Sequence, residues 1–266
     1  MVQTRDNANA VELKLSPLFI PYSDVNFGKY RLLEHQAKLK DSKNRLIILN
    51  APTSSGKTLG IISRIYESGK NAILVYPTNE LIRDQANQIK NYLKSINVPV
   101  KLFIPPLEEN EAHINSNSSV FNLFVFNSII LDEIMELLAE KAKEFNILLR
   151  AKGDVIKYLL MTMRGRKIIL TNPDSIFLLS RAEYKHGFNL LRELRRANFS
   201  IIAFDEFHMY SGVALANMLI SLRRIHQYFD QIIVSTATLP HTHVIEYLAR
   251  FVDSEKDVFT FSPKVY

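Results

Sequence analysis

The segment NAPTSSGKTLG, residues 50–60, has the residue types and spacing of a phosphate-binding loop. It fits the pattern A-x-x-x-x-G-K-[ST], in which backbone N–H groups at a helix N-terminus face the phosphates of a nucleotide. Lys57 would pair with the β and γ phosphates, and Thr58 would hold Mg²⁺. The cradle itself would consist of Thr53, Ser54, Ser55 and Gly56. The alternative is an ordinary turn between a strand and a helix.

Two adjacent acids follow an apolar run in IIAFDEFHMY, residues 201–210. Burying carboxylates is costly unless they bind a cation or another partner. Asp205 would hold Mg²⁺ through its water shell, and Glu206 would orient and deprotonate an attacking water. His208 lies two residues further on and would sense the state of the γ-phosphate. The alternative for this segment is a capped strand end at the surface.

A third segment, VSTATLP at residues 234–240, ends another apolar run with hydroxyl side chains. Ser235, Thr236 and Thr238 would hydrogen-bond to the acidic pair and couple the nucleotide state to strand binding. Taken by themselves, they would be ordinary turn residues.

Alternating apolar runs and helical segments must position these residues. Runs rich in Ile, Val and Leu predict strands at 45–50, 71–77, 100–104, 167–171, 200–206 and 231–237. Helical spacing predicts helices at 57–68, 79–94, 174–184, 188–197, 213–228 and 241–252. Such alternation indicates an α/β fold with a mainly parallel sheet covered by helices on both faces, and ligands at the carboxyl ends of the strands. Residues 105–165 break the alternation, and their amphipathic segment after Ser128 predicts a helical insertion.

The composition of the chain indicates which classes of protein it can belong to. The chain has 266 residues, 47% apolar content and a formal net charge of +6, which suits a polyanionic partner. No apolar run is long enough to span a membrane, and residues 1–15 lack the apolar core of a signal peptide. The absence of cysteine excludes disulfides and thiolate metal sites and indicates a cytoplasmic protein.

Together, the motifs resemble the first RecA-like domain of superfamily 2 helicases of the DExH type. The match is ordered along the chain: APTSSGKT, YPTNELIRDQ, LTNPD, DEFH and STATLP, which correspond to motifs I, Ia, Ib, II and III. The resemblance implies a P-loop domain over residues 1–266, with ATP and Mg²⁺ as ligands. It also implies that Gln36 of YRLLEHQ, in an N-terminal segment at 1–44, contacts adenine beside Tyr30 or Phe27.

The same resemblance implies where a nucleic-acid strand would lie. Backbone phosphates would contact residues of motifs Ia and Ib, because such enzymes must pass any sequence. The implied contacts are Pro77, Thr78, Asn79, Arg83, Thr171, Asn172 and Asp174. The expected strand is single-stranded DNA, and RNA stays open because backbone contacts tolerate both.

Within this group the chain resembles most the CRISPR-associated helicase of type I interference systems (the Cas-three type), including its subtype D branch. The resemblance rests on HQ before the loop and on the segments NAPTSSGKT, DEFHMYSG and TATLP. The resemblance implies partnership with a CRISPR effector complex and a separately encoded nuclease, because no His-Asp dipeptide occurs here.

No segment after residue 240 resembles motifs IV to VI, so we expect a second RecA-like domain in cis or in trans. This chain would then hydrolyse ATP poorly alone. A DExH RNA helicase domain, or a nucleotide-dependent recruitment module without unwinding, are the alternatives.

Overall fold

The structure is a computed structural model that describes residues 18–19, 21–103, 120–127, 131–133, 135–136, 152–162, 164–180, 187–238, 242–252, 256–260 and 264–265. Its central feature is an eight-stranded sheet whose neighbouring strands all pair in parallel. In spatial order the strands are β11 (Lys256–Thr260), β4 (Leu46–Asn50), β10 (Gln231–Thr236), β9 (Phe199–Phe204), β5 (Asn71–Val75), β8 (Arg166–Thr171), β7 (Phe121–Phe126) and β6 (Val100–Phe103). The predicted α/β class with a mainly parallel sheet is therefore confirmed.

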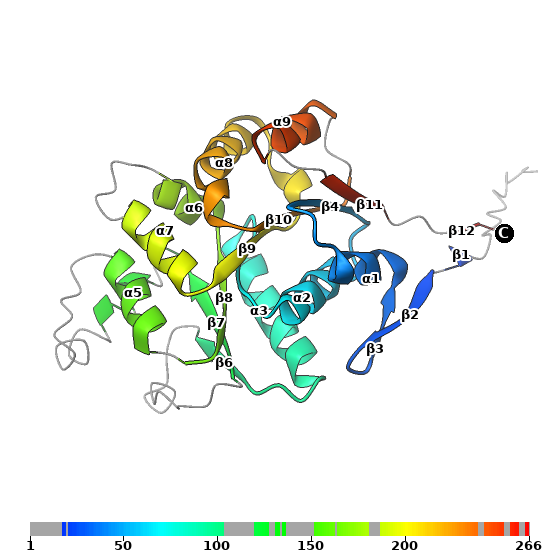
Figure 1. Ribbon diagram of the computed structural model, residues 1–266, viewed down its shortest axis with the longest axis horizontal. Coiled ribbons are helices and arrows are strands. Elements are labelled where there is room, and N and C mark those ends of the chain that lie inside the picture. Colours follow the sequence, from blue (N-terminus) through cyan, green and yellow to red (C-terminus); the bar gives the residue numbers. More distant parts are fainter. Residues whose placement is uncertain are drawn as a thin grey trace, which may run out of the picture.

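Helices cover both faces of this sheet (Figure 1). One side carries α1 (Glu34–Asp41), α2 (Lys57–Ser68) and α3 (Asn79–Lys94). The opposite side carries α5 (Lys152–Thr162), α6 (Pro173–Ser180), α7 (Gly187–Arg196), α8 (Gly212–Ile225) and α9 (Thr242–Val252). Single 3₁₀ turns flank α8, namely η2 (Phe207–Met209) and η3 (His226–Tyr228).

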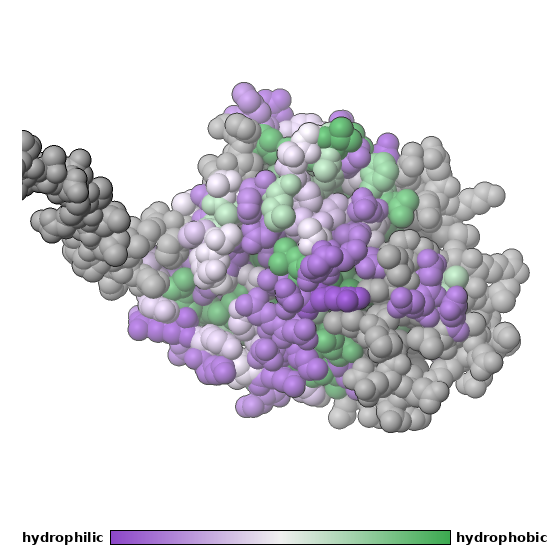
Figure 2. Space-filling view, turned by 180° about the vertical axis from the view of Figure 1, so that it is seen from behind, coloured by the Kyte–Doolittle hydropathy of each residue, from purple (hydrophilic) through white to green (hydrophobic). Residues whose placement is uncertain are grey.

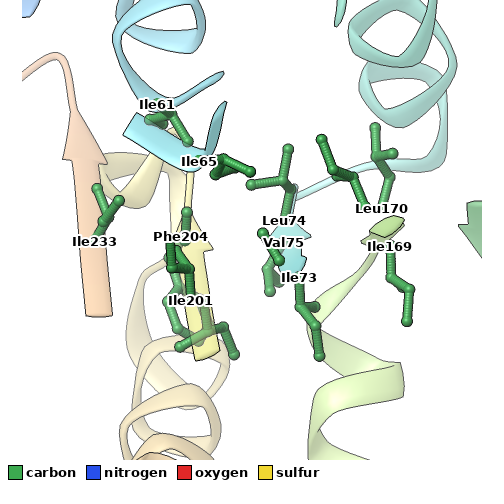
Figure 3. Close-up of a cluster of buried hydrophobic side chains, with 14 of the residues drawn as sticks. Ile61, Ile65, Ile73, Leu74, Val75, Ile169, Leu170, Ile201, Phe204 and Ile233 are labelled. Atoms are coloured by element: carbon green, nitrogen blue, oxygen red, sulfur yellow. The ribbon is translucent and has the colours of Figure 1, made fainter. Parts of the chain in front are cut away.

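The core explains why the strands read as continuous apolar runs. Every residue of β9 and β10 is buried, because helices cover both faces of the sheet. Ile61 and Ile65 of α2 lie over the strands that carry Leu74, Phe204 and Ile233 (Figure 3). This packing fixes the positions of the strand ends at which the chemical motifs begin.

Backbone hydrogen bonds continue past the strand ends and align the loops that follow. The N–H of Ala51 donates to the carbonyl of Thr236 at 3.0 Å, which ties the loop after β4 to β10. The N–H of Asp205 donates to the carbonyl of Val75 at 2.9 Å, just beyond β9 and β5. The polar residues predicted at these ends are therefore held along a single edge of the sheet.

The range 105–165 differs from the predicted helical insertion. It contains α5, but also β7, whose residues are all buried and which pairs with β8 and β6 in the main sheet. The prediction missed β7 because its short apolar run follows an Asn- and Ser-rich stretch. Residues 131–133 and 135–136 are helical, and the rest of the predicted amphipathic helix, including Ser128, lies outside the described residues.

Two smaller sheets complete the described part of the chain. The hairpin of β2 (Tyr22–Phe27) and β3 (Tyr30–Leu33) leads directly into α1 (Figure 1), and β1 (Leu18–Phe19) pairs with β12 (Lys264–Val265). Seen from behind, hydrophilic side chains gather over the centre of the described surface, with small apolar areas between them (Figure 2). Within the described ranges, no helix combines the length and apolar character needed to span a membrane.

Candidate functional site

The loop between β4 and α2 has the backbone geometry of a phosphate cradle. Ser54 and Gly56 adopt left-handed backbone conformations, with φ of +65° and +73°. An added Cβ at position 56 would also meet the side-chain nitrogen of Gln36, so that amide would have to move away from the loop. Helix α2 begins at Lys57. The unpaired N–H groups of its first turn therefore lie at the loop, where an anion would bind.

The side chain of Gln36, in α1, hydrogen-bonds to the backbone of this loop. Its Oε1 accepts from the N–H of Leu33 at 2.8 Å, and its Nε2 donates to the carbonyls of Ser55 at 3.1 Å and Gly56 at 2.8 Å. The side chain is buried, so both ends of its amide are used within the protein. Contact between Gln36 and adenine, which the sequence predicted, would require some of these hydrogen bonds to open.

His35 lies beside Gln36 and is also buried. Burial lowers its pKa from the usual 6.5 to about 4, although the Ser55 backbone opposes the shift, and the positive charge of Lys57 lowers the pKa further. His35 is therefore neutral at physiological pH.

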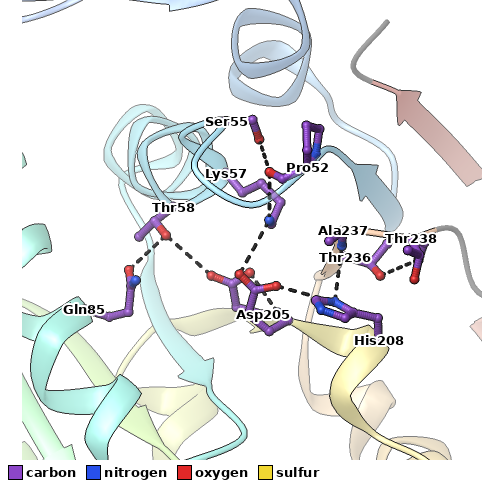
Figure 4. A network of polar contacts seen from close by, with 11 residues as sticks. Pro52, Ser55, Lys57, Thr58, Gln85, Asp205, His208, Thr236, Ala237 and Thr238 are labelled. Atoms are coloured by element: carbon purple, nitrogen blue, oxygen red, sulfur yellow. Dashed lines mark hydrogen bonds and ion pairs between the residues drawn. The ribbon is translucent and has the colours of Figure 1, made fainter. Parts of the chain in front are cut away.

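Lys57 and Thr58 face the end of β9 (Figure 4). The ammonium of Lys57 donates to the Pro52 carbonyl at 3.2 Å and lies 3.5 Å from Glu206 Oε1. The hydroxyl of Thr58 lies 2.9 Å from Gln85 Oε1 and 3.4 Å from Asp205 Oδ2. Four of the predicted site residues, from two distant segments, thus meet at one place.

The acidic pair has an unusual backbone as well as a buried carboxylate. Burial raises the pKa of Asp205, the Ser235 hydroxyl lowers it, and the charge of Glu206 raises it again. Glu206 has φ of +49°, a left-handed conformation that costs a residue with a side chain about 1–2 kcal/mol. Among the described residues, the other non-glycine positions with positive φ outside this site are Asn97 and Asn198, and asparagine tolerates this conformation well.

Thr58 and Asp205 fit the predicted magnesium ion. Mg²⁺ prefers oxygen ligands and commonly takes one or two protein groups, with water and substrate phosphate completing its shell. A hydroxyl and a carboxylate 3.4 Å apart meet that requirement. Within the described ranges, no cluster of three His, Cys, Asp or Glu side chains offers a cage made by the protein alone.

His208 lies between Glu206 and the residues that follow β10. His208 Nδ1 lies 3.4 Å from Glu206 Oε2 and 3.3 Å from the backbone nitrogen of Ala237. The Thr236 hydroxyl, predicted to reach the acids, donates instead to the carbonyl of Thr238 at 2.6 Å. The Ser235 hydroxyl of β10 lowers the pKa of Asp205, and the Ala237 backbone contacts His208 and neither acid. The side chain of Thr238 is exposed.

A pocket of about 780 Å³ opens beside the loop. The β2–β3 hairpin contributes Tyr22, Tyr30 and Arg31 to its lining, and Gln36 and residues 52–56 form the opposite wall. The Arg31 side chain donates to the Ser23 carbonyl at 2.7 Å and lies over the Tyr22 ring. Phe27, predicted as an alternative to Tyr30 near the base, is buried against Tyr66 and does not line this pocket.

The residues implied to contact nucleic acid form a second group further along the same edge. A groove of about 520 Å³ is lined by Pro77, Thr78, Asn79, Asn172 and Asp174, among others. Thr171 is not part of it, because its buried hydroxyl donates to the Phe126 carbonyl at 2.6 Å. Arg83 is exposed on α3, one turn beyond Asn79, and lies outside the groove lining.

Several residues at these sites had not been singled out from the sequence. Gln85 contacts Thr58 but stood at the end of the quoted motif YPTNELIRDQ without a role of its own. Met209, Tyr210 and Asn217 line the groove. Met209 and Tyr210 follow the acidic pair closely, which was their only sequence signal. Asn217 lies within α8, whose helical spacing does not show which face meets a neighbouring loop.

Part of the chain matches a known protein family. Residues 34–135 match the DEAD/DEAH box helicase family. A segment of the chain is 34% identical over 96 residues to reverse gyrase 2 of Sulfurisphaera tokodaii, and this covers 33% of the chain and 8% of that protein.

The fold is similar to that of a solved helicase over nearly the whole chain. The DUF1998 helicase MrfA bound to DNA and AMPPNP superposes with a TM-score of 0.57 and 19% identity, covering 92% of this chain and 31% of that one. MrfA bound to DNA gives a TM-score of 0.54 and 19% identity, covering 90% and 29%. The RecA-like helicase fold is therefore shown, and the chain spans about a third of the length of MrfA.

Proposed function

We propose that this chain is the ATP-binding motor domain of a superfamily 2 helicase acting on single-stranded DNA. The match of residues 34–135 to the DEAD/DEAH box helicase family and the similarity of the fold to that of MrfA support the proposal. The observation that carries the proposal is the convergence of Lys57, Thr58, Asp205 and Glu206 from two strand ends. A phosphate loop facing paired acids at the carboxyl edge of a parallel sheet suits phosphoryl transfer.

In this proposal the loop binds the phosphates of ATP through the N–H groups at the start of α2. Lys57 exchanges its contact with Glu206 for the β and γ phosphates, since these carry more negative charge than one carboxylate. Glu206 is thereby released to accept a proton from the attacking water. The Glu206 Oε2 atom is buried and lies 3.4 Å from His208 Nδ1, which is longer than an ordinary hydrogen bond, so it can still accept a proton from water.

Thr58 and Asp205 would hold the magnesium ion. Held by these two residues, Mg²⁺ would neutralise negative charge that develops on the transferred phosphate. The buried Asp205 carboxylate gains a positive partner in this way, which offsets the burial that raises its pKa.

The rest of the motor is proposed to come from a second RecA-like domain, in cis or in trans. An arginine supplied across such an interface accelerates phosphoryl transfer by about 10³–10⁵. The coverage of MrfA, about a third of that chain, supports a partner domain. We therefore expect slow ATP turnover from these 266 residues alone.

Equilibrium binding and turnover test the proposal directly. The wild-type chain should bind AMPPNP in the presence of Mg²⁺, and single-stranded DNA should raise its ATP turnover. Lys57→Ala should lose nucleotide binding. Absence of AMPPNP binding to the folded wild-type chain would overturn the proposal.

The remaining outcomes separate the alternatives. Stimulation by single-stranded RNA and not by DNA would replace DNA with RNA as the substrate. Binding of nucleotide and strand without turnover, even with a second RecA-like domain added, would favour a recruitment module. Under both outcomes the proposed nucleotide site is retained, and only the substrate or the activity coupled to nucleotide binding changes.

The narrower proposal is a CRISPR type I interference helicase that unwinds target DNA with an effector complex and a separate nuclease. It rests on the likeness of DEFHMYSG and the neighbouring motifs. Its test is whether a target-bound type I effector complex raises ATP turnover above the level reached with the same DNA alone. Equal turnover would contradict it.

A further inference from the structure

The hydroxyl of Thr58, one of the two residues proposed to hold magnesium, has two acceptor oxygens close to it. Gln85 Oε1 lies 2.9 Å away and Asp205 Oδ2 lies 3.4 Å away. They approach from two sides, Gln85 from α3 and Asp205 from the end of β9 (Figure 4). A threonine hydroxyl has one proton to donate, so these two oxygens compete for it.

The two distances assign the proton of Thr58 to Gln85. Hydrogen bonds between two oxygen atoms span about 2.5–3.0 Å, a range that includes the Gln85 contact and excludes the Asp205 contact. With its proton directed at Gln85, the Thr58 oxygen keeps its lone pairs available on its other side. Because a hydroxyl binds a metal ion through a lone pair, this arrangement leaves Thr58 ready to act as a ligand.

The same arrangement keeps one oxygen of Asp205 available. Its Oδ1 accepts from the N–H of Glu206 at 2.9 Å, and Oδ2 is the oxygen that faces Thr58. If Thr58 donated its proton to Oδ2, this proton would take a lone pair that the water shell of the ion also needs. Donation to Gln85 leaves Oδ2 open to that shell.

Gln85 suits this task because its side chain is neutral and its helix is held in place. The buried residues Ile82, Ala86 and Ile89 pack α3 against the core. Gln85 precedes Ala86 and is half-buried. Its amide oxygen accepts a hydrogen bond without adding a charge, whereas a carboxylate at this position would place a third negative charge beside the acidic pair.

We propose that Gln85 is a positioning residue of the magnesium site. It accepts the proton of Thr58, which leaves the lone pairs of that hydroxyl for the ion and keeps Asp205 Oδ2 free. The inference rests on the proposed function, because it assumes that a nucleotide binds here together with Mg²⁺. Groups that hydrogen-bond to a metal ligand fix its orientation, and their loss weakens metal binding by about 10–100-fold.

The experiment is a calorimetric titration of the full 266-residue chain with AMPPNP, repeated over a series of Mg²⁺ concentrations and in EDTA. Gln85→Met keeps the length of the side chain and removes its acceptor. We expect the Mg²⁺ concentration that gives half-maximal enhancement of AMPPNP binding to rise about tenfold. The affinity in EDTA should stay unchanged, because Lys57 and the phosphate loop are intact. A wild-type Mg²⁺ dependence in Gln85→Met would overturn the inference.

Two further variants separate the acceptor from other effects of the substitution. Gln85→Glu keeps an acceptor oxygen and loses only the amide nitrogen, so it should need no more Mg²⁺ than the wild-type chain. The same tenfold rise in Gln85→Glu as in Gln85→Met would overturn the acceptor role. Gln88→Met is the matched control and should keep the wild-type Mg²⁺ dependence, because Gln88 is exposed on the same helix and its side chain interacts with Tyr92.

The outcomes distinguish this inference from the proposed function. If AMPPNP does not bind the folded wild-type chain at any Mg²⁺ concentration, the proposed function fails together with the inference. If Mg²⁺ strengthens AMPPNP binding equally in the wild-type chain and in Gln85→Met, only the role of Gln85 fails. If Gln85→Met weakens binding by the same factor in EDTA and in Mg²⁺, Gln85 supports the loop and not the ion, which also contradicts the inference.

Discussion

The ammonium of Lys57 lies 3.5 Å from the carboxylate of Glu206, and only 4% and 20% of these side chains are exposed. The contact joins the start of α2 to the end of β9. Each charge compensates the other in a largely buried setting, where an unpaired charge would be costly. In the proposed function, the phosphates of the nucleotide would therefore replace Glu206 as the partner of Lys57.

Glu206→Gln and Lys57→Ala should separate catalysis from binding. We expect Glu206→Gln to retain AMPPNP binding, because Lys57 is freed from its ion pair, while ATP turnover falls by about 10² or more through loss of the general base. Lys57→Ala should lose AMPPNP binding itself. Calorimetric titration with AMPPNP and a phosphate-release assay measure the two quantities. Full turnover in Glu206→Gln would remove the catalytic role from that residue.

Gln36→Met should weaken nucleotide binding by about tenfold for ATP and GTP alike. The substitution keeps the side-chain volume but removes the amide that donates to Ser55 and Gly56 and accepts from Leu33. A net loss of about 1.4 kcal/mol from these hydrogen bonds corresponds to this factor. Competition binding with both nucleotides measures the effect. Gln227→Met, at an exposed residue of η3 before the start of β10, is the matched control.

The nucleotide comparison decides what Gln36 does. An equal loss for ATP and GTP indicates that Gln36 positions the loop. A loss confined to ATP would instead support the predicted contact with adenine.

His35 should make the protein less stable in acid. Its pKa is about 4 in the folded chain and about 6.5 when unfolded, so the unfolded chain binds the proton more readily. The contribution to stability is fully present above pH 6.5 and is lost as pH falls towards 4, by roughly 3 kcal/mol in total. Urea unfolding at several pH values should show a shallower pH dependence for His35→Gln. Identical slopes would contradict the assignment.

Tyr210→Phe should stabilise the protein. The hydroxyl of Tyr210 is buried and has no hydrogen-bond partner among the described residues, while its ring packs against Phe207. Removing an unsatisfied buried hydroxyl and keeping the ring should raise the free energy of unfolding by about 1 kcal/mol. Tyr22→Phe, at a 49% exposed ring, should change little. A destabilised Tyr210→Phe would reveal a partner for the hydroxyl.

The parallel sheet and its covering helices could be predicted because each follows from a local pattern. Strands buried on both faces appear as continuous apolar runs, and helices α2 and α3 begin and end at the predicted residues. The loop after β4 and the acids after β9 could be placed together because parallel strands bring their carboxyl ends to one edge.

Features that depend on distant partners could not be predicted in this way. The β2–β3 hairpin was missed because Ser23, Asp24 and Asn26 make its first strand read as polar. The Gln36 contacts join residues about 20 positions apart and depend on how α1 packs on α2. The groove likewise appears only when α3, α6 and α8 are placed together.

The strand order has a consequence for communication between the two sites. From β4, which carries the phosphate loop, to β8, which leads into the groove, the order runs β4, β10, β9, β5 and β8. Four steps of about 4.8 Å give a separation of roughly 19 Å that backbone hydrogen bonds set and side chains cannot adjust. The end of β9 lies at the midpoint of this order. The acidic pair therefore lies midway between the phosphate loop and the groove, at a spacing that the sheet keeps fixed.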